Sequence, residues 1–302
     1  MPELPDVVLY VEHLERRLVG ATLLKARVVS PNLLRTAVPP LEAAEGRVVR
    51  GVRRMGKRIV VALDENLFLV FHLMIAGRLH WREAAAKPRA KVDLAHFEFS
   101  SGHLLLTEAG SKKRASLHLV ASREALAPFE RGGLEVLESD LTAFRQALGR
   151  ESHTLKRALT DPRLFSGIGN AYSDEILHRA RLSPQALTGR LSDEQVKRLF
   201  AAARGTLFEW TERLRKECGD GFPDKVTAFR DGMAVHGRYG KPCPDCGSPV
   251  QRIVYAENEC NYCPRCQTER RMLADRALSR LLKDDWPRTL EELEVSPLAR
   301  RR

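Results

Sequence analysis

Met1-Pro2-Glu3-Leu4-Pro5-Asp6 opens the chain and leads directly into a helical pattern. The apolar side chains that recur at helical spacing after it are Val7, Val8, Val11, Leu14 and Leu18. A helix is therefore predicted over residues 6–18. If that helix packs into a core, it holds the first residues of the chain in place, which is the condition for them to act chemically.

Pro2 is a candidate nucleophile. Once Met1 is removed, Pro2 carries a secondary amine, and α-amino groups titrate near pH ~8. Such an amine attacks an electrophilic sugar carbon and leaves an iminium. Glu3 stands beside it and is placed to move protons. The alternative is a processed, frayed terminus without chemistry, as at the ends of most domains.

The sequence pattern of residues 21–122 predicts a β structure. Several short apolar runs separated by turn signals are typical of a sandwich or barrel. The runs cover residues 21–29, 47–63, 67–81, 92–99, 103–106 and 115–120. Residues 83–91 are expected to form a loop. A basic cluster, Arg53 to Arg58, enters one of the strands, and its Lys57 is a candidate phosphate ligand, or else a charge that protects a solvated strand edge.

The second half is predicted to be largely helical. Helical patterns cover residues 140–148, 154–159, 171–180 and 192–216. Between the second and third, Gly167-Ile168-Gly169-Asn170 makes a tight turn that opens a helix. Backbone N–H groups there, with the Asn170 side chain, would bind an anion such as a DNA phosphate. A simple helix-to-helix turn is the alternative.

Charge and hydropathy restrict the partners. The net charge is +11 and the pI is near 9.6, which favours a polyanion such as nucleic acid, although a generally basic surface has the same composition. Acidic residues interrupt any signal-peptide pattern at the start, and no apolar run reaches the ~20 residues that span a bilayer. We therefore expect a cytoplasmic, nucleoid-associated protein without a membrane partner.

The cysteine spacing indicates a metal site. Cys243-x2-Cys246 and Cys263-x2-Cys266 form two pairs that supply four thiolates, the preference of one structural Zn²⁺. The segment 250–255 between the pairs reads as one strand of a hairpin. Cys260 has a less suitable spacing and is expected to stay free.

These motifs, in this order, resemble the formamidopyrimidine-DNA glycosylase and endonuclease VIII family of base-excision repair enzymes. The opening is similar to the family's MPELPEV, and Lys57 matches its strand lysine. GIGNAYSDEIL, which begins at Gly167, resembles the helix–two-turn–helix signature, and the four cysteines match its zinc finger. The resemblance covers residues 2–268.

The resemblance implies an α+β fold and assigns roles. An N-terminal β-sandwich with an N-terminal helix would precede a helix–two-turn–helix domain and a zinc hairpin. Pro2 would form a Schiff base at C1′, Glu3 would be the general acid/base, and Lys57 and Asn170 would grip phosphates of damaged DNA. A monomer would flip the base out, release it and nick the strand by β,δ-elimination. Domain bounds of 1–125, 126–138 (linker), 139–232, 233–270 and 271–302 are expected.

Four positions depart from the family pattern. Asp6 replaces a glutamate, and Ile75 stands where a methionine fills the gap left by the flipped base, with Met74 one residue before it. The Arg-Arg-Phe of formamidopyrimidine-type members is not evident. Lys112, Lys113 and Arg114 are the substitute phosphate contacts, and Asn258 replaces the finger arginine.

Substrate and activity are left open by these departures. The segment 218–237 looks shorter than the loop that caps 8-oxoguanine, so oxidised pyrimidines, abasic sites and ring-opened purines are equal candidates. A catalytically silent protein that binds abasic or damaged DNA is the main alternative. A zinc-hairpin regulator is a weaker one, because no recognition helix carries a convincing set of base-reading side chains.

Overall fold

The computed structural model describes residues 1–295, apart from residues 85–88, 90, 111, 225, 228, 256–257 and 275. The chain divides into two compact units. The first unit comprises Met1–Arg131 with Glu209–Ala228, and the second comprises Gly132–Phe208 with Phe229–Arg302. No helix in the described part of the chain combines the length and apolarity needed to cross a membrane.

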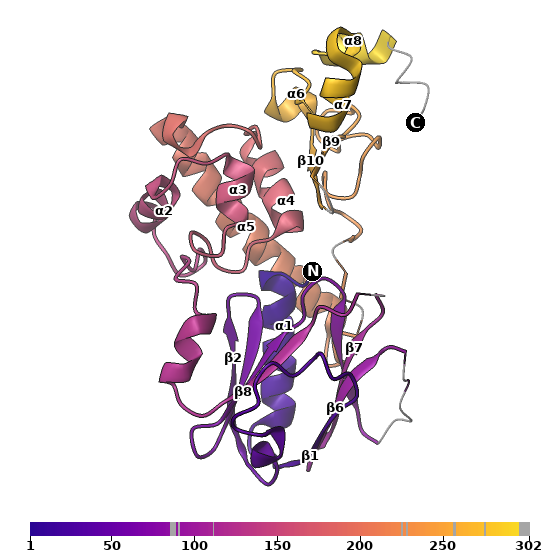
Figure 1. Ribbon diagram of the computed structural model, residues 1–302. Helices are drawn as coiled ribbons and strands as arrows, with labels where there is room; N and C mark the ends of the chain where they lie inside the picture. Colours follow the sequence, from indigo (N-terminus) through magenta and orange to yellow (C-terminus); the bar gives the residue numbers. More distant parts are fainter. Residues whose placement is uncertain are drawn as a thin grey trace. The chain divides into compact units, whose positions relative to one another are not determined.

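The first unit is a β-sandwich of two four-stranded antiparallel sheets (Figure 1). One sheet has the order β1 (Leu23–Val28), β6 (Asp93–Phe99), β7 (Gly102–Glu108), β5 (Gly77–Arg82). The other has the order β2 (Val49–Met55), β3 (Arg58–Leu63), β4 (Phe68–His72), β8 (Ser116–Val120). Alternate side chains of both sheets fill one core, as the pleat requires. The predicted sandwich is confirmed.

Helix α1 (Leu4–Leu18) packs on β2 and β3 of this unit. Its buried apolar side chains recur every three or four residues and join the sandwich core, at Val7, Tyr10, Leu14 and Leu18. Pro5 lies in its first turn, where a missing N–H costs nothing. The helix thus begins two residues before the predicted Asp6, and the core fixes its position.

Two of the predicted β runs each contain two strands. The run 47–63 is divided by a turn at Gly56 and Lys57, where Gly56 has a φ of 60°. The run 67–81 is divided by the turn at residues 73–76, between β4 and β5. At residues 73–76 apolar residues continue through the turn, and at Gly56 the basic residues on both sides carry no typical turn signal beyond a single glycine. Of the predicted loop 83–91, residues 85–88 and 90 lie outside the described residues.

The second unit contains the predicted helices. They are α2 (Leu141–Gly149), α3 (Leu155–Thr160), α4 (Asn170–Ala180) and α5 (Asp193–Cys218), joined by short 3₁₀ turns such as η3 (Thr188–Arg190). Asp140 caps α2 by accepting the Ala143 N–H at 2.8 Å. Helix α5 is continuous, and its last part belongs to the first unit. Two other 3₁₀ helices, η1 (Leu41–Ala44) and η2 (Glu124–Phe129), lie in the first unit.

A hairpin and a C-terminal extension complete the second unit. Strands β9 (Gln251–Tyr255) and β10 (Asn258–Tyr262) pair antiparallel, and the short helix α6 (Pro264–Gln267) follows. The extension contains α7 (Arg276–Leu282), η4 (Lys283–Asp285) and α8 (Leu290–Val295). It is tied to the hairpin by the Leu273 N–H, which donates to the Tyr262 hydroxyl at 2.9 Å. The final residues 296–302, with their predicted basic end, lie outside the described residues.

Replacing Gly77 with alanine is expected to destabilise the first unit. A Cβ at Gly77 would lie 2.3 Å from the Leu73 carbonyl oxygen, which is a backbone atom and already accepts the Gly77 N–H. We expect a loss of about 1–3 kcal/mol in the free energy of unfolding, the range for overpacked sites. Denaturant titration followed by circular dichroism measures it.

The matched control is Gly51→Ala, in β2, where a Cβ would meet no atom within 4 Å. We expect that variant to stay within about 0.5 kcal/mol of the wild type. Equal losses in the two variants would contradict the packing argument for the turn at residues 73–77.

Candidate functional site

The amino terminus is held by a capping box at the start of α1. The Glu3 backbone N–H donates to Asp6 Oδ2 at 2.9 Å, and the Glu3 carboxylate accepts the Asp6 N–H in return. Both carboxylates are 2% exposed. Pro2 is buried, and Met1 before it is only partly exposed. The residue at position 2 is therefore fixed, and its nitrogen becomes a free amine only when Met1 is removed.

Charged groups surround the amino group of the chain. Burial is the main cause that lowers the pKa of the Met1 amine from 8.0. The carboxylates of Glu3 and Asp6 raise that pKa, while the positive charges of Arg78 and Lys57 lower it. The net direction is downward. This environment favours an uncharged, nucleophilic amine near neutral pH, with a carboxylate at hand for proton transfer.

Arg78 is a site residue that the sequence analysis missed. Its Nε donates to the Val226 carbonyl at 2.5 Å, and its Nη1 donates to the carbonyls of Ile75 at 3.2 Å and Gly77 at 2.6 Å. In the sequence it is an ordinary charge on a strand. The contact that identifies it joins β5 to a segment 148 residues further along the chain, which no local pattern signals.

Lys57 lies in the turn between β2 and β3, after Gly56. The basic cluster that was predicted to enter a strand is thus divided across that turn. The cluster lies near His72, at the end of β4. Burial is the largest cause that lowers the pKa of His72 to about 4, and the charges of Arg58 and Lys57 lower it further. The neutral imidazole of His72 and the positive charges of Lys57 and Arg58 consequently lie together at this end of β3 and β4.

The turn between β4 and β5 presents the two candidate wedge residues. Met74 has a φ of 52° and is partly buried, whereas the Ile75 side chain is 47% exposed. The Ile75 carbonyl accepts a bond from Arg78, so the turn is fixed to the same arginine that acts on the amino terminus. Of the two side chains, Ile75 is the one that projects into solvent.

Lys113 and Arg114 follow β7 and are organised by Glu108, which is 1% exposed. One Glu108 carboxylate oxygen accepts the backbone N–H groups of Arg114 at 2.9 Å and Ala115 at 3.1 Å. Lys113 Nζ donates to the carbonyls of Glu108 and Lys91, the latter at 3.0 Å. The Lys113 ammonium thus supports its own loop in this structure.

The segment after α5 is fastened to the first unit. Phe222 packs against Tyr10 of α1 with ring centroids 5.8 Å apart, and Val226 joins the sandwich core. Asp224 accepts from His80 at 2.9 Å and from Arg82 at 3.2 Å. The first part of the short segment 218–237 is therefore tied at several points, within the described part of residues 219–227.

In the second unit, Asn170 is the first residue of α4, as the glycine turn predicted. Gly167 has a φ of 78°, which allows the chain to turn before the helix, and Gly169 is the N-cap. Asn170 Nδ2 donates to the Glu259 carbonyl of β10 at 2.8 Å. Lys156 Nζ donates to the Asn170 carbonyl at 2.7 Å. The helix start thus gathers one amide and one ammonium next to the first N–H groups of α4.

Further along α4, two buried carboxylates hold the segment that precedes the cysteines. Asp174 Oδ2 lies 2.8 Å from His236 Nδ1, and its Oδ1 accepts from Lys156 at 2.6 Å. Glu175 accepts the backbone N–H groups of Ala234, Val235 and His236 at 2.7–2.9 Å. These carboxylates are accordingly structural in this fold, because each is fully engaged with the protein.

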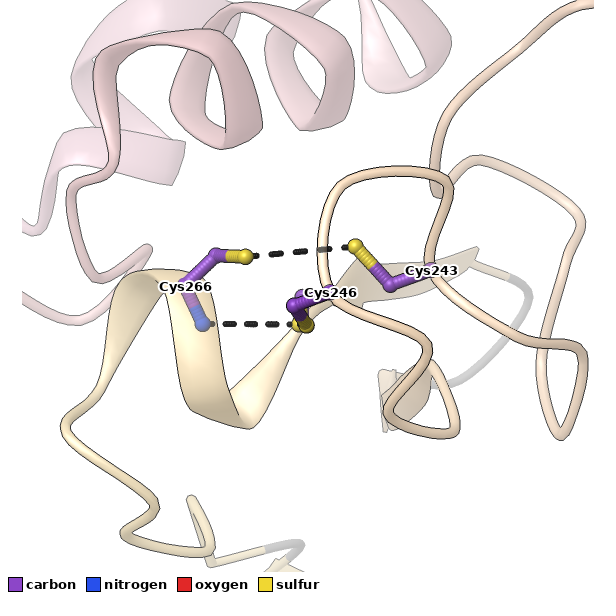
Figure 2. Close-up of side chains that lie close together, drawn as sticks. Cys243, Cys246 and Cys266 are labelled. Carbon is purple, nitrogen blue, oxygen red and sulfur yellow. Dashed lines mark hydrogen bonds between the residues drawn. The ribbon is translucent and has the colours of Figure 1, made fainter.

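The four predicted cysteines converge. Figure 2 shows Cys243 and Cys246 on the loop before β9 and Cys266 on α6, with their sulfurs directed toward one another. With Cys263, all four Sγ atoms lie within 4.8 Å of one another. The Sγ atoms of Cys243 and Cys266 are 3.9 Å apart, and those of Cys246 and Cys263 are 3.4 Å apart. A tetrahedron with Zn–S bonds of ~2.3 Å has edges of about 3.8 Å, so the cluster fits a four-thiolate shell.

Two other predicted residues lie on the same hairpin. Cys260 is 1% exposed and packs with Ile253 and Tyr262, outside the four-cysteine cluster. Burial raises the pKa of its thiol, which keeps it protonated. Asn258 opens β10 opposite Tyr255 in the ladder, and only its backbone is among the described parts of the chain.

The predicted site residues thus form two groups, one in each unit. In the first unit, the charges of Glu3, Lys57 and Arg78 act on the terminal amine. Arg78 also donates a hydrogen bond to the Ile75 carbonyl. In the second unit, α4 brings Asn170 to the hairpin that carries the cysteines. Arg78 is the group of the first unit that the sequence analysis missed, and the buried pair of Asp174 and His236 is a missed structural contact of the second.

Comparison with known proteins identifies the same two parts. The model of the formamidopyrimidine-DNA glycosylase N-terminal domain matches residues 1–114, and that of the formamidopyrimidine-DNA glycosylase H2TH domain matches residues 133–215. A formamidopyrimidine-DNA glycosylase of Heliobacterium modesticaldum is 34% identical over 281 residues, which are 88% of this chain and all of that protein. An uncharacterized formamidopyrimidine-DNA glycosylase-like protein of Mycobacterium tuberculosis is 41% identical over 150 residues, 50% of this chain and 91% of that protein.

A solved structure has the same fold. The Lactococcus lactis enzyme, in complex with DNA that contains an abasic site, superimposes with a TM-score of 0.76 at 25% identity, over 88% of this chain and 99% of that one. The sandwich, the helical unit and the hairpin with four clustered cysteines agree with this similarity. The chain belongs to the formamidopyrimidine-DNA glycosylase family.

Proposed function

We propose that the protein is a DNA glycosylase and abasic-site lyase whose nucleophile is the Pro2 amine. The observation that carries this proposal is the amino terminus: a capping box fixes residue 2, and burial with Arg78 and Lys57 lowers the pKa of the terminal amine. Removal of Met1 would place the Pro2 nitrogen in that same environment. Family membership supports the reaction class.

The proposed reaction begins at C1′ of a flipped nucleotide. The Pro2 nitrogen forms a bond to C1′ and gives up its proton, the glycosidic bond breaks, and the base leaves with a proton. The C1′–O4′ bond then breaks and O4′ takes a proton from Glu3, which leaves an iminium between C1′ and the Pro2 nitrogen. The iminium acidifies the C2′ hydrogen, so loss of the C2′ proton expels the 3′ phosphate, and a second elimination expels the 5′ phosphate. The products are a one-nucleotide gap with a phosphate at each end and an unsaturated sugar fragment, which is released when water hydrolyses the iminium.

Binding would divide between the two groups of residues. Lys57 and Asn170 are the proposed phosphate ligands, one from each unit. Asn170 is the first residue of α4, and helix starts are common phosphate sites, although its amide would have to exchange the Glu259 carbonyl for phosphate. Ile75 is the proposed wedge, because its side chain is the more exposed of the two candidates. Lys113, Arg114 and Asn258 are secondary contacts, and Lys113 would have to exchange backbone carbonyls for phosphate.

The proposed cofactor is one structural Zn²⁺ held by Cys243, Cys246, Cys263 and Cys266. The sulfur separations support it, and four thiolates leave no position open for catalysis. The ion would join the loop before β9 to α6 and so hold the hairpin in shape.

The proposed substrate is DNA with an oxidised pyrimidine, a ring-opened purine or a missing base, bound by a monomer in the cytoplasm. The segment 218–237 is short, and its first part is tied to α1 through Phe222 and to β5 through Asp224, which supports a site without a cover for 8-oxoguanine. Oxidised pyrimidines, ring-opened purines and abasic sites need no such cover. A panel of duplex and single-stranded oligonucleotides, each with one lesion, ranks these substrates by nicking rate.

Borohydride is expected to trap a covalent complex on abasic-site DNA, because it reduces the iminium to a stable amine. Protein processed to begin at Pro2 should form the adduct. The control is the same chain with Met1 retained by an added N-terminal tag, which should form none, since its residue 2 has no free amine. Gel shift under denaturing conditions measures both.

A Pro2→Gly variant with an intact amine tests the residue itself and should trap far less. An adduct that survives this change undiminished would count against Pro2. Binding of abasic DNA without any adduct or nick would instead support a silent damage-binding protein, an alternative that the replacements at Asp6, Ile75 and Asn258 motivate.

The rate of trapping should rise with pH, because only the uncharged amine attacks, and the burial that lowers the pKa of the Met1 amine should lower that of the Pro2 amine as well. Arg78→Met removes a charge that lowers this pKa, so its profile should move to higher pH. The control, Arg27→Met on the exposed side of β1, should leave the profile in place. A profile unmoved by Arg78→Met would contradict the electrostatic argument.

Metal analysis should find one zinc per chain. Cys246→Ser should lose the ion, since three thiolates no longer close the shell, whereas Cys260→Ala should retain it because Cys260 lies outside the cluster. Zinc loss from Cys260→Ala at full folding would show that the ligand set is wrong.

A further inference from the structure

His178 is a buried polar residue of α4 that the proposed reaction does not use. Its side chain is 4% exposed, and its Nε2 lies 3.3 Å from Cys243 Sγ, within hydrogen-bonding distance of a sulfur acceptor. Asp245 Oδ2 is next nearest, at 4.0 Å, beyond a normal hydrogen bond. The contact joins residues 65 positions apart, so the fold brings them together rather than the local chain.

The same face of α4 carries a row of polar contacts to β10, to the segment before the cysteines and to the loop before β9. Asn170, Asp174 and His178 recur every fourth residue and therefore lie along one side of the helix. Asn170 contacts the Glu259 carbonyl, Asp174 contacts His236, and His178 contacts Cys243. The last contact places the helix against one of the four thiolates themselves.

We propose that His178 is a positioning residue for the zinc site, with its Nε2–H donating to the Cys243 thiolate. This inference rests on the proposed zinc site. Four thiolates give a divalent zinc centre an excess of negative charge, and an N–H donor in a buried setting disperses it. Groups that hydrogen-bond metal ligands fix ligand orientation and raise affinity, and their loss costs about 10–100-fold in metal binding.

The arrangement also connects the metal to the candidate DNA contact. Asn170 and His178 lie on the same helix. Asn170 bonds to β10 and His178 contacts Cys243 on the loop before β9, so a zinc ion held by the cysteines and α4 would hold each other in place. Loss of the His178 contact should therefore loosen the hairpin at its cysteine end while the Asn170 contact remains.

The test is the rate at which the holoprotein releases zinc to a chromogenic chelator. His178→Phe keeps a planar ring and removes the donor, and we expect release about 10–100-fold faster than wild type. His178→Gln retains an N–H donor and should recover part of the difference. His153→Phe, the same substitution at another histidine of this unit, should release zinc at the wild-type rate because His153 pairs with Glu151 and contacts no cysteine.

Cobalt substitution separates a positioning role from direct ligation. The d–d spectrum of the Co²⁺ protein should be that of four thiolates in the wild type and in His178→Phe. A spectrum of three thiolates and one nitrogen in the wild type would overturn the proposal, because His178 would then be a ligand. Asp245→Asn should leave zinc release unchanged, whereas acceleration equal to that of His178→Phe would assign the effect to Asp245.

The possible failures are distinguishable. A wild-type protein without zinc would refute the proposed metal site itself. A wild type with one zinc and a folded His178→Phe variant that releases zinc at the wild-type rate would refute only the role of His178. If His178→Phe does not fold, equal release from His178→Gln and His178→Ala, each loaded with one zinc, would overturn the role.

Discussion

The hydrogen bond from the Glu3 backbone N–H to Asp6 Oδ2 is the constraint on which the proposed chemistry of this protein depends. It starts α1 directly after residue 2, and the buried face of α1 then anchors that start in the sandwich core. A nucleophile at the end of a chain would normally fray. Here the first turn of α1, with the buried carboxylates of Glu3 and Asp6, restricts the motion of residue 2.

The replacement of the usual glutamate by Asp6 is compatible with this arrangement. The shorter carboxylate reaches the Glu3 N–H across one helical turn, which is the geometry of a capping box. In this structure Asp6 therefore serves the helix start as well as the charge balance of the terminal amine. Lys57, in the turn after β2, and Arg78, in β5, supply the opposing positive charge. The start of α1, this turn and β5 therefore all act on the pKa of the terminal amine.

The second unit contains a two-stranded hairpin, which is marginally stable alone. The four cysteines cluster beside it, and a zinc ion held by them would join the loop before β9 to α6. Helix α4 contacts β10 through Asn170, the segment before the cysteines through Glu175, and Cys243 through His178. These polar contacts act together with the apolar cluster of Ile253, Cys260 and Tyr262 in the hairpin.

Local patterns predicted the fold, and distant contacts were beyond them. The α1 periodicity, the Gly-Ile-Gly-Asn turn and the paired cysteines are signals within short windows, and the structure has the corresponding elements where they were expected. The turn at Gly56 was missed because it lies inside a basic cluster with a single glycine as its turn signal. Arg78 and His178 were missed because their partners, Val226 and Cys243, are remote in sequence.

The central claim is that residue 2 carries the bond to DNA, and peptide mapping of the borohydride-reduced complex by mass spectrometry tests it most directly. The account predicts that the sugar remnant is attached to the amino-terminal peptide, at the nitrogen of Pro2. Attachment to a lysine would contradict it, and Lys57 is the candidate because its charge acts on the terminal amine.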